Sequence, residues 1–259
     1  MPTIELKSSR EIALLKQAGQ TAARILRKVC EAVQPGVTTR ELNAKAESWM
    51  REQNVIPAFL NYRGYPAVLC TSVNDEVVHS IPGDRVLKHG DLISIDIGIY
   101  QNGYCGDTAT TIAVGDVSPA ARRLMNVGWE SLQNSLAAAR LGNRLGDVSY
   151  AMGEVVEKNG FYVVHEYGGH GIGRRMHEDP HVACSGRSGM GIRLQEGLVL
   201  ALEVMANEKS SAIDHKDDGW TVVTAEHGLS VHYEDMVAVT ANGPEILTEL
   251  PEGMYGKGR

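Results

Sequence analysis

Apolar and polar side chains alternate along residues 92–101 and predict a β-strand with one buried face. The apolar face is isoleucine at every second position: Ile93, Ile95, Ile97 and Ile99. Such alternation is typical of a strand whose apolar face points into a core. The Asn-Gly pair at 102–103 favours a two-residue hairpin turn, because both central positions of that turn require positive φ. We therefore expect a β-hairpin here.

The polar face of this hairpin carries two carboxylates. A turn at 102–103 pairs Asp96 with Ala109 and then Asp107 with Gly98. Asp96 and Asp107 become diagonal neighbours on one face, with Cβ atoms about 7 Å apart or slightly less. Ionised carboxylates this close repel, and a cation between them relieves the repulsion. A three-residue turn would change the pairing, and in the alternative reading the aspartates only hydrogen-bond the turn.

Two helices are expected before the hairpin and two after it. The first pair begins at residues 8 and 38, where a hydroxyl residue three positions before a glutamate makes a capping box, and ends near residues 35 and 54. The second pair begins near residues 118 and 147 and ends at glycines 142 and 160. Strand-like runs that alternate with glycine-rich loops follow at 161–164, 198–206, 220–224 and 231–240. Two helices followed by strands, twice over, predict an α+β protein of two similar halves in a single domain, residues 1–259.

Composition and charge narrow the function classes. A formal net charge of −7 argues against a nucleic acid as the substrate, since a protein surface that binds nucleic acid is basic. No apolar run approaches eighteen residues and the amino terminus lacks the apolar segment of a signal peptide, so we expect a cytoplasmic protein that does not use a membrane. The four cysteines form no Cys-x-x-Cys pair and are expected to be reduced thiols. Without a heptad repeat, a monomer is expected.

Two further carboxylates interrupt apolar strands, and a histidine lies in a glycine-rich stretch. Glu203 is the only polar residue in 198–205, and Glu234 has a comparable position in 231–239. Burying an unpaired carboxylate costs several kcal/mol unless it is neutralised, hydrogen-bonded or bound to metal. His170 adds a nitrogen ligand, and His177 follows seven residues later.

Together these residues form a set of four carboxylates and one imidazole: Asp96, Asp107, His170, Glu203 and Glu234. That set suits two divalent cations, Co²⁺, Mn²⁺, Fe²⁺ or Zn²⁺, bridged by carboxylates. Taken singly, each residue has a plainer reading. A glutamate in a strand usually faces solvent, and a lone histidine, such as His181, is more often a surface residue than a ligand.

The order of seven separated positions closely resembles the type I methionine aminopeptidases of the pita-bread fold: His79, Asp96, Asp107, His170, His177, Glu203 and Glu234. The resemblance extends from about residue 12 to residue 248. It implies that the five residues of the set above bind the metals. It also implies three catalytic residues: Glu203 accepts a proton, His177 stabilises the oxyanion, and His79 contacts the amide nitrogen on the leaving side.

The resemblance further implies a methionine pocket of aromatic and sulfur-containing side chains: Phe59, Tyr62, Tyr65, Cys70, Met176 and Trp220, with His79 and His177 beside the scissile bond. A thioether packs well against ring edges. For Cys70 and Met176 an ordinary core position is an equally reasonable reading. Several residues depart from the pattern of the family and leave specificity and metal preference open: Phe59, Arg63, Val204, His232 and Asp235.

The function expected from these patterns is a metal-dependent aminopeptidase that removes the initiator methionine from nascent proteins when the second residue is small. The implied partners are nascent N-termini, and docking at the ribosome is left open. Two alternatives stay open. One is a pita-bread peptidase that cleaves before proline, and the other is a pita-bread binding protein without catalysis. Intact ligands and both histidines speak against the second.

Overall fold

The protein is seen here as a computed structural model that describes residues 4–249. In this range the helices are α1 (Ser9–Glu31), α2 (Thr39–Glu52), α3 (Pro119–Ala138) and α4 (Leu145–Lys158), with one 3-10 helix, η1 (Tyr62–Gly64). The hydroxyls of Ser8, Thr38 and Ser118 each accept a hydrogen bond from the backbone three residues later, as predicted. All four predicted helices are confirmed, although α1 ends at Glu31 rather than at Pro35.

The strands within the described residues are β1 (Ile56–Pro57), β2 (Cys70–Val73), β3 (Glu76–Val78), β4 (Leu92–Gln101), β5 (Tyr104–Ala113), β6 (Tyr162–Val163), β7 (Gly168–Gly171), β8 (Glu178–Ala183), β9 (Val199–Asn207), β10 (Ile213–His215), β11 (Val222–Thr224), β12 (Ser230–Thr240) and β13 (Gly243–Ile246). A 10-stranded sheet has the main order β1-β4-β5-β12-β9-β7-β8, with β2, β13 and β6 paired beside β4, β12 and β9. A 3-stranded sheet has the order β10-β11-β3. The α+β class is confirmed.

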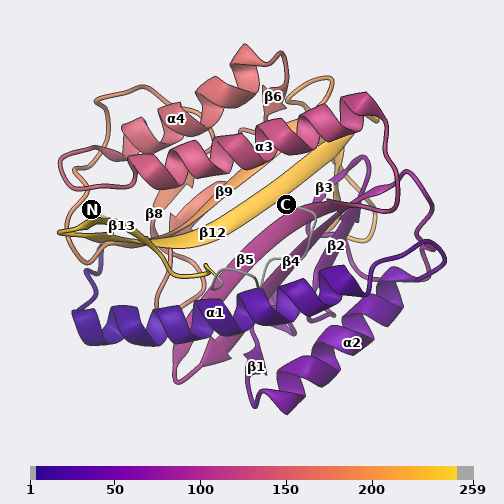
Figure 1. The fold of residues 1–259 in the computed structure, drawn as a ribbon, viewed down its shortest axis with the longest axis horizontal. Coiled ribbons are helices and arrows are strands. Elements are labelled where there is room, and N and C mark those ends of the chain that lie inside the picture. The colour runs from indigo at the N-terminus through magenta and orange to yellow at the C-terminus, as the bar shows by residue number, and fades with distance from the viewer. Residues whose placement is uncertain (1–3, 250–259) are drawn as a thin grey trace.

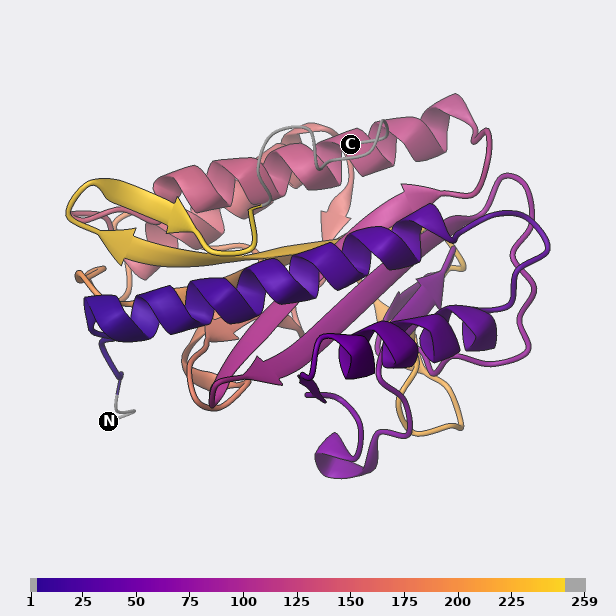
Figure 2. The same ribbon diagram turned by 60° about the horizontal axis from the view of Figure 1, so that its bottom comes forward.

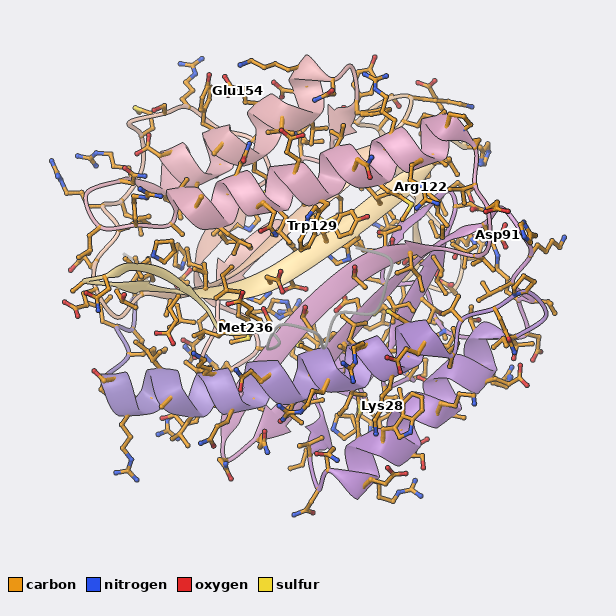
Figure 3. The ribbon with its side chains drawn as sticks, viewed as in Figure 1. Lys28, Asp91, Arg122, Trp129, Glu154 and Met236 are labelled. Atoms are coloured by element: carbon orange, nitrogen blue, oxygen red, sulfur yellow. The ribbon has the colours of Figure 1, made fainter. Side chains whose placement is uncertain are left out.

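The helices lie on one face of the large sheet, with α1 and α2 over the first-half strands and α3 and α4 over the second-half strands (Figures 1 and 2). The isoleucine face of β4 is fully buried in the core formed with α1 and α2. Over the other half, Trp129 of α3 lies above β12 (Figure 3), and its ring centroid is 6.0 Å from that of Tyr233. The polar face of β4 therefore points away from the helices.

The predicted hairpin register is confirmed. Gln101 pairs with Tyr104, Asp96 pairs with Ala109, and Gly98 pairs with Asp107. Asn102 has φ 53° and Gly103 has φ 79°, the positive values that a two-residue turn requires. The local sequence thus places both aspartates on the face of the sheet that the helices leave uncovered.

The glycine-rich stretch around His170 is a strand, and our interpretation of it as a loop was wrong. β7 pairs with both β8 and β9. A Cβ at Gly169 would lie 2.4 Å from the carbonyl oxygen of Ala201, and one at Gly168 would lie 2.4 Å from that of Val182. Glycine is needed here because neighbouring backbones approach too closely for any side chain, although its low strand propensity conceals the strand in the sequence.

Candidate metal and substrate site

The uncovered face of the sheet holds a cavity of about 430 Å³. Every site residue predicted from the sequence lines it: Phe59, Tyr62, Tyr65, Cys70, His79, Asp96, Asp107, His170, Met176, His177, Glu203, Trp220 and Glu234. The five candidate metal ligands come one each from β4, β5, β12, β9 and β7, which are successive neighbours in the large sheet. Residues far apart in the sequence therefore meet through strand order alone.

Three buried ligand groups lie close together at the centre of the cavity. The potential ligand atoms of Asp107, His170 and Glu234 lie within 4.8 Å of one another. Glu234 pairs directly with Glu203 across β12 and β9, and with Ala109 across β12 and β5. The second carboxylate pair is thus joined to the hairpin through β12.

Several carboxylate oxygens in this group have no partner in the part of the chain that the structure describes. They are Asp96 Oδ1, Asp107 Oδ1 and Glu234 Oε1, all of them buried atoms. Burial, followed by the charge of Glu203, raises the pKa of Asp107 to about 8. Burial, followed by repulsion from Asp107, raises the pKa of Asp96 and of Glu234 well above the usual range. Unpaired buried carboxylates are costly, so the donor set is suited to a cation.

Glu203 behaves differently because it has a partner. Burial by itself raises the pKa of this carboxyl, but a hydrogen bond and the charge of His232 outweigh burial and bring the pKa to about 2. His232 Nε2 donates to Glu203 Oε2 at 3.1 Å, and only 3% of the His232 side chain is exposed. Glu203 is therefore an ionised carboxylate even without a metal.

Two histidines have Nδ1 engaged in a hydrogen bond. His170 Nδ1 donates to the carbonyl oxygen of Gly171 at 2.9 Å, which leaves Nε2 with a lone pair for a ligand. The hydroxyl of Tyr62 forms a hydrogen bond of 2.8 Å with His177 Nδ1, which leaves Nε2 of His177 available to a substrate. Burial and the nearby imidazole of His170 lower the pKa of His177 to about 4, which keeps that ring neutral at pH 7.

His79 lines the cavity between aromatic rings and has an unusual backbone conformation. Its φ is 61°, a left-handed conformation that is uncommon for histidine and is concentrated at functional sites. Its ring lies edge-on to those of Tyr167 and Trp220, with centroids 5.3 and 6.4 Å away. Burial lowers the pKa of His79. A neutral imidazole in a fixed orientation results.

The apolar end of the cavity is built from rings and sulfur. Tyr65 contacts Phe59 and Trp220 edge-on, with centroids 6.5 and 5.1 Å apart. Phe59, Tyr65, Cys70 and Met176 belong to one buried cluster. A Cβ at Gly98 would lie 2.5 Å from the Phe59 ring, so glycine at that strand position makes room for the phenylalanine.

This arrangement agrees with comparisons to known proteins. The description "Metallopeptidase family M24" fits residues 13–241. The chain belongs to metallopeptidase family M24. It is similar to the methionine aminopeptidase of Clostridium acetobutylicum, with 46% identity over 246 residues, which is 95% of this chain and 98% of that protein. Membership in M24 makes the chain a metal-dependent hydrolase, and the carboxylate and imidazole group is its candidate site for divalent metal.

Solved structures of M24 proteins confirm the pita-bread fold and the resemblance to methionine aminopeptidases. The methionine aminopeptidase of Rickettsia prowazekii has a TM-score of 0.94 at 38% identity, covering 95% of this chain and all of that one. The prolidase of Pyrococcus furiosus has a TM-score of 0.76 at 24% identity and is matched over 66% of its length. At that identity the prolidase shares only the fold, so cleavage before proline is not the favoured activity.

Four residues that the sequence interpretation missed also line the cavity: Tyr167, Glu178, Asp179 and His181. His181 is exposed, as expected of a surface histidine, and it reaches the cavity because it pairs with His170 across β7 and β8. No signal in the sequence marked this position, since the glycine strand that defines the pairing resembles a loop.

The departures from the family pattern have distinct surroundings. His232 contacts Glu203, whereas Asp235 Oδ1 accepts a hydrogen bond from Thr248 Oγ1 at 2.6 Å. Arg63 has φ 50° and lies with its guanidinium carbon 5.4 Å from the centroid of the Tyr62 ring. Val204 is fully buried in the core.

Within residues 4–249 we find no helix with the length and hydropathy that a membrane span requires.

Proposed function

We propose that this chain removes the N-terminal methionine from newly made polypeptides whose second residue is small. The observation that carries the proposal is one cavity that combines two features: buried carboxylate oxygens without a partner among residues 4–249, and a pocket of rings and sulfur. The first feature suits a metal-dependent hydrolase, and the second suits a thioether side chain. The relatives named methionine aminopeptidase support the same conclusion.

The metal centre that we propose has two divalent ions, drawn from Co²⁺, Mn²⁺, Fe²⁺ and Zn²⁺. The residues that would hold these ions are Asp96, Asp107, His170, Glu203 and Glu234. The fit is supported by the close approach of the Asp107, His170 and Glu234 ligand atoms, and by the carboxylate oxygens that have no partner within residues 4–249. Two bound cations would lower the pKa of a water molecule and polarise the scissile carbonyl.

The side chains around the centre have separate tasks in hydrolysis. Glu203, ionised and oriented by His232, accepts the proton of the attacking water. His177 donates a hydrogen bond from Nε2 to the carbonyl oxygen as negative charge develops on it, because Tyr62 occupies Nδ1. His79 contacts the amide nitrogen on the leaving side.

The methionine side chain occupies the apolar end of the cavity. Phe59, Tyr65, Cys70, Met176 and Trp220 surround it with ring edges and sulfur, which favour a polarizable thioether. Tyr62 lies at the mouth beside Arg63, where the chain of the substrate leaves.

We also propose that the enzyme acts as a single domain and a monomer in the cytoplasm, close to the ribosome. Support for one domain is the pairing of β12 with β5, which joins the two halves in one sheet.

Support for ribosome docking is an arginine patch on two adjoining loops. The backbones of Arg144 and Arg193 pair in a β-bridge, and Arg140 and Arg187 are exposed. Phosphate contacts would be salt-dependent, so cosedimentation with ribosomes should fall when Arg140 and Arg193 become glutamate.

The test of the reaction is release of free methionine by metal-stripped protein after each metal is added back. We expect cleavage of Met-Ala-Ser and none of Met-Leu-Ser, with no release before metal is added. Cleavage of a peptide whose second residue is proline, without cleavage of Met-Ala-Ser or Met-Leu-Ser, would favour the proline-directed alternative.

The absence of cleavage with every metal, in protein that is folded by circular dichroism, would contradict the peptidase assignment and favour a binding protein. Calorimetry with a methionine-containing peptide would then be the informative measurement.

A further inference from the structure

The loop between β7 and β8, residues 172–177, carries two side chains of the site, Met176 and His177. Both line the cavity, and His177 is the group to which the proposed function assigns the oxyanion. Strand pairing holds the two ends of the loop, Gly171 and Glu178, after a register shift between His170 and Gly171. Contacts from elsewhere in the chain add to this anchoring.

One such contact is a buried ion pair from the beginning of the described chain. Lys7 Nζ lies 2.7 Å from Glu178 Oε2, and only 5% of each side chain is exposed. Glu178 directly follows His177, and its other carboxylate oxygen accepts the backbone N–H of Arg175 at 3.1 Å. One carboxylate thus links Lys7 to the loop on both sides of His177.

Lys7 is itself firmly held. Its backbone N–H donates to the carbonyl oxygen of Gly197 at 2.7 Å, and Ser8 after it caps α1. A Cβ at Gly173 would lie 2.6 Å from both Lys7 Nζ and Glu178 Oε1, so the loop closes tightly over the ion pair. The lysine therefore connects the start of α1 in the first half to a catalytic loop in the second half.

The same chain offers a contrasting ion pair from α1. Lys16 Nζ lies 2.8 Å from Glu245 Oε1, but the two side chains are 41% and 40% exposed. Exposed pairs contribute little to stability, whereas breaking a buried pair leaves an uncompensated charge. Lys16 is accordingly a matched control for Lys7.

We propose that Lys7 is a positioning residue for His177. It holds Glu178, and through Glu178 the 172–177 loop, at the place where the His177 ring can reach the scissile carbonyl. The proposal rests on the role of His177 in the proposed function. It gives Lys7 a task in catalysis although this residue does not line the cavity.

The test uses the metal-loaded, full-length protein and the substrate Met-Ala-Ser. Because a misplacement of about 1 Å can cost about 100-fold in rate, Lys7→Met should lower kcat by about 10- to 100-fold with little change in KM. Bound metal, measured by atomic emission, should stay at the level of the unaltered protein. Lys16→Met should leave kcat, KM and metal content unchanged.

The double variant Lys7→Met with Glu178→Gln separates positioning from mere stabilisation. It removes the unpaired buried charge, so the unfolding midpoint should recover relative to Lys7→Met while kcat stays low. Recovery of kcat together with the midpoint would overturn the proposal, as would a Lys7→Met kcat equal to that of Lys16→Met. If Lys7→Met does not fold, the double variant is compared with the unaltered protein instead.

The failure of this proposal is distinguishable from failure of the proposed function. Full activity of His177→Ala would remove the role assigned to His177. Loss of activity in His177→Ala but not in the double variant would leave that role intact and reject Lys7 as the residue that positions it.

Discussion

The two halves of the sheet bring carboxylates to the same cavity by different routes. In the first half, Asp96 and Asp107 lie on strands joined by a two-residue turn. In the second half, Glu203 and Glu234 are directly paired on β9 and β12, but a segment with two strands of its own separates them in sequence. The first pair is placed by a local turn and the second by long-range pairing.

The carboxylates of the cavity also differ in how their charges are compensated. The hairpin aspartates each have a buried oxygen without a partner in residues 4–249, and burial raises the pKa of both. Glu203 has His232 as a hydrogen-bond donor and a pKa of about 2. Glu234 of the second half resembles the hairpin aspartates, because it too has a buried oxygen without a partner in this range and a raised pKa. These three carboxylates therefore need a cation, whereas Glu203 is already ionised and can accept a proton.

The largest expected effect tests this division directly. Glu203→Gln should lower kcat by about 100- to 10,000-fold even at saturating metal, because the proton acceptor is lost. Asp96→Asn should lower metal affinity but recover much of its kcat when metal is raised. Steady-state hydrolysis of Met-Ala-Ser across a metal titration measures both.

Equal behaviour of the two variants would contradict the division. If Glu203→Gln recovers with excess metal, Glu203 acts only as a ligand, and the proton acceptor must be sought elsewhere in the cavity.

The same contrast explains how much could be predicted from the sequence. The hairpin register followed from isoleucine alternation and Asn102-Gly103, since turn geometry fixes which residues oppose each other. The helices followed from their caps, as at Ser8 and Thr38. Each of these signals lies within a few residues of the structure that it determines.

The remainder depends on pairings between distant segments. The apolar runs around Glu203 and Glu234 predicted strands, but nothing local states that these two residues face each other. The strand at His170 was missed because its glycines serve a close approach of neighbouring backbones. Carboxylates and a histidine at unexpected positions indicated the five candidate ligands, and the resemblance to a known family added the catalytic histidines and the pocket residues. The contact of His232 with Glu203 required the structure.

The second expected effect concerns pH and stability of the metal-stripped protein. The pKa of Asp107 is about 8 in the folded state but close to 4 in the unfolded chain. Between these values the folded state binds more protons than the unfolded state, so the free energy of unfolding should fall as pH rises from 4 to 8. Thermal unfolding at pH 6 and pH 8 measures this fall.

Asp107→Asn is the control, since it should flatten that part of the profile. Glu203 should act in the opposite sense: its pKa is lowered to about 2, so its contribution is present above the unfolded pKa and is lost as pH falls toward 2. A metal-stripped protein that gains stability between pH 6 and pH 8 would contradict the raised pKa of Asp107.

A smaller effect is expected at His232, the residue that distinguishes Glu203 from the hairpin aspartates. His232→Leu leaves every proposed ligand in place but removes the donor to Glu203 Oε2. Loss of such a supporting hydrogen bond typically weakens metal binding by about 10- to 100-fold. Calorimetric titration of the metal-stripped variant measures this, and unchanged affinity would mean that His232 does not orient Glu203.

The smallest expected effect compares the caps of the long helices in the two halves. Ser118 Oγ accepts the N–H of Ala121 at 3.1 Å, with Pro119 at the first helical position. At the start of α1, Ser8 Oγ accepts the N–H of Glu11 at 3.4 Å, and the carboxylate of Glu11 accepts the N–H of Ser8 at 2.9 Å. Ser118→Ala should therefore cost about 1 kcal/mol in unfolding free energy, and Ser8→Ala should cost less because Glu11 still holds the end of the helix. Urea titrations of metal-loaded protein measure both costs, and a larger loss for Ser8→Ala would show that the serine, rather than the reciprocal glutamate bond, secures the start of α1 beside Lys7.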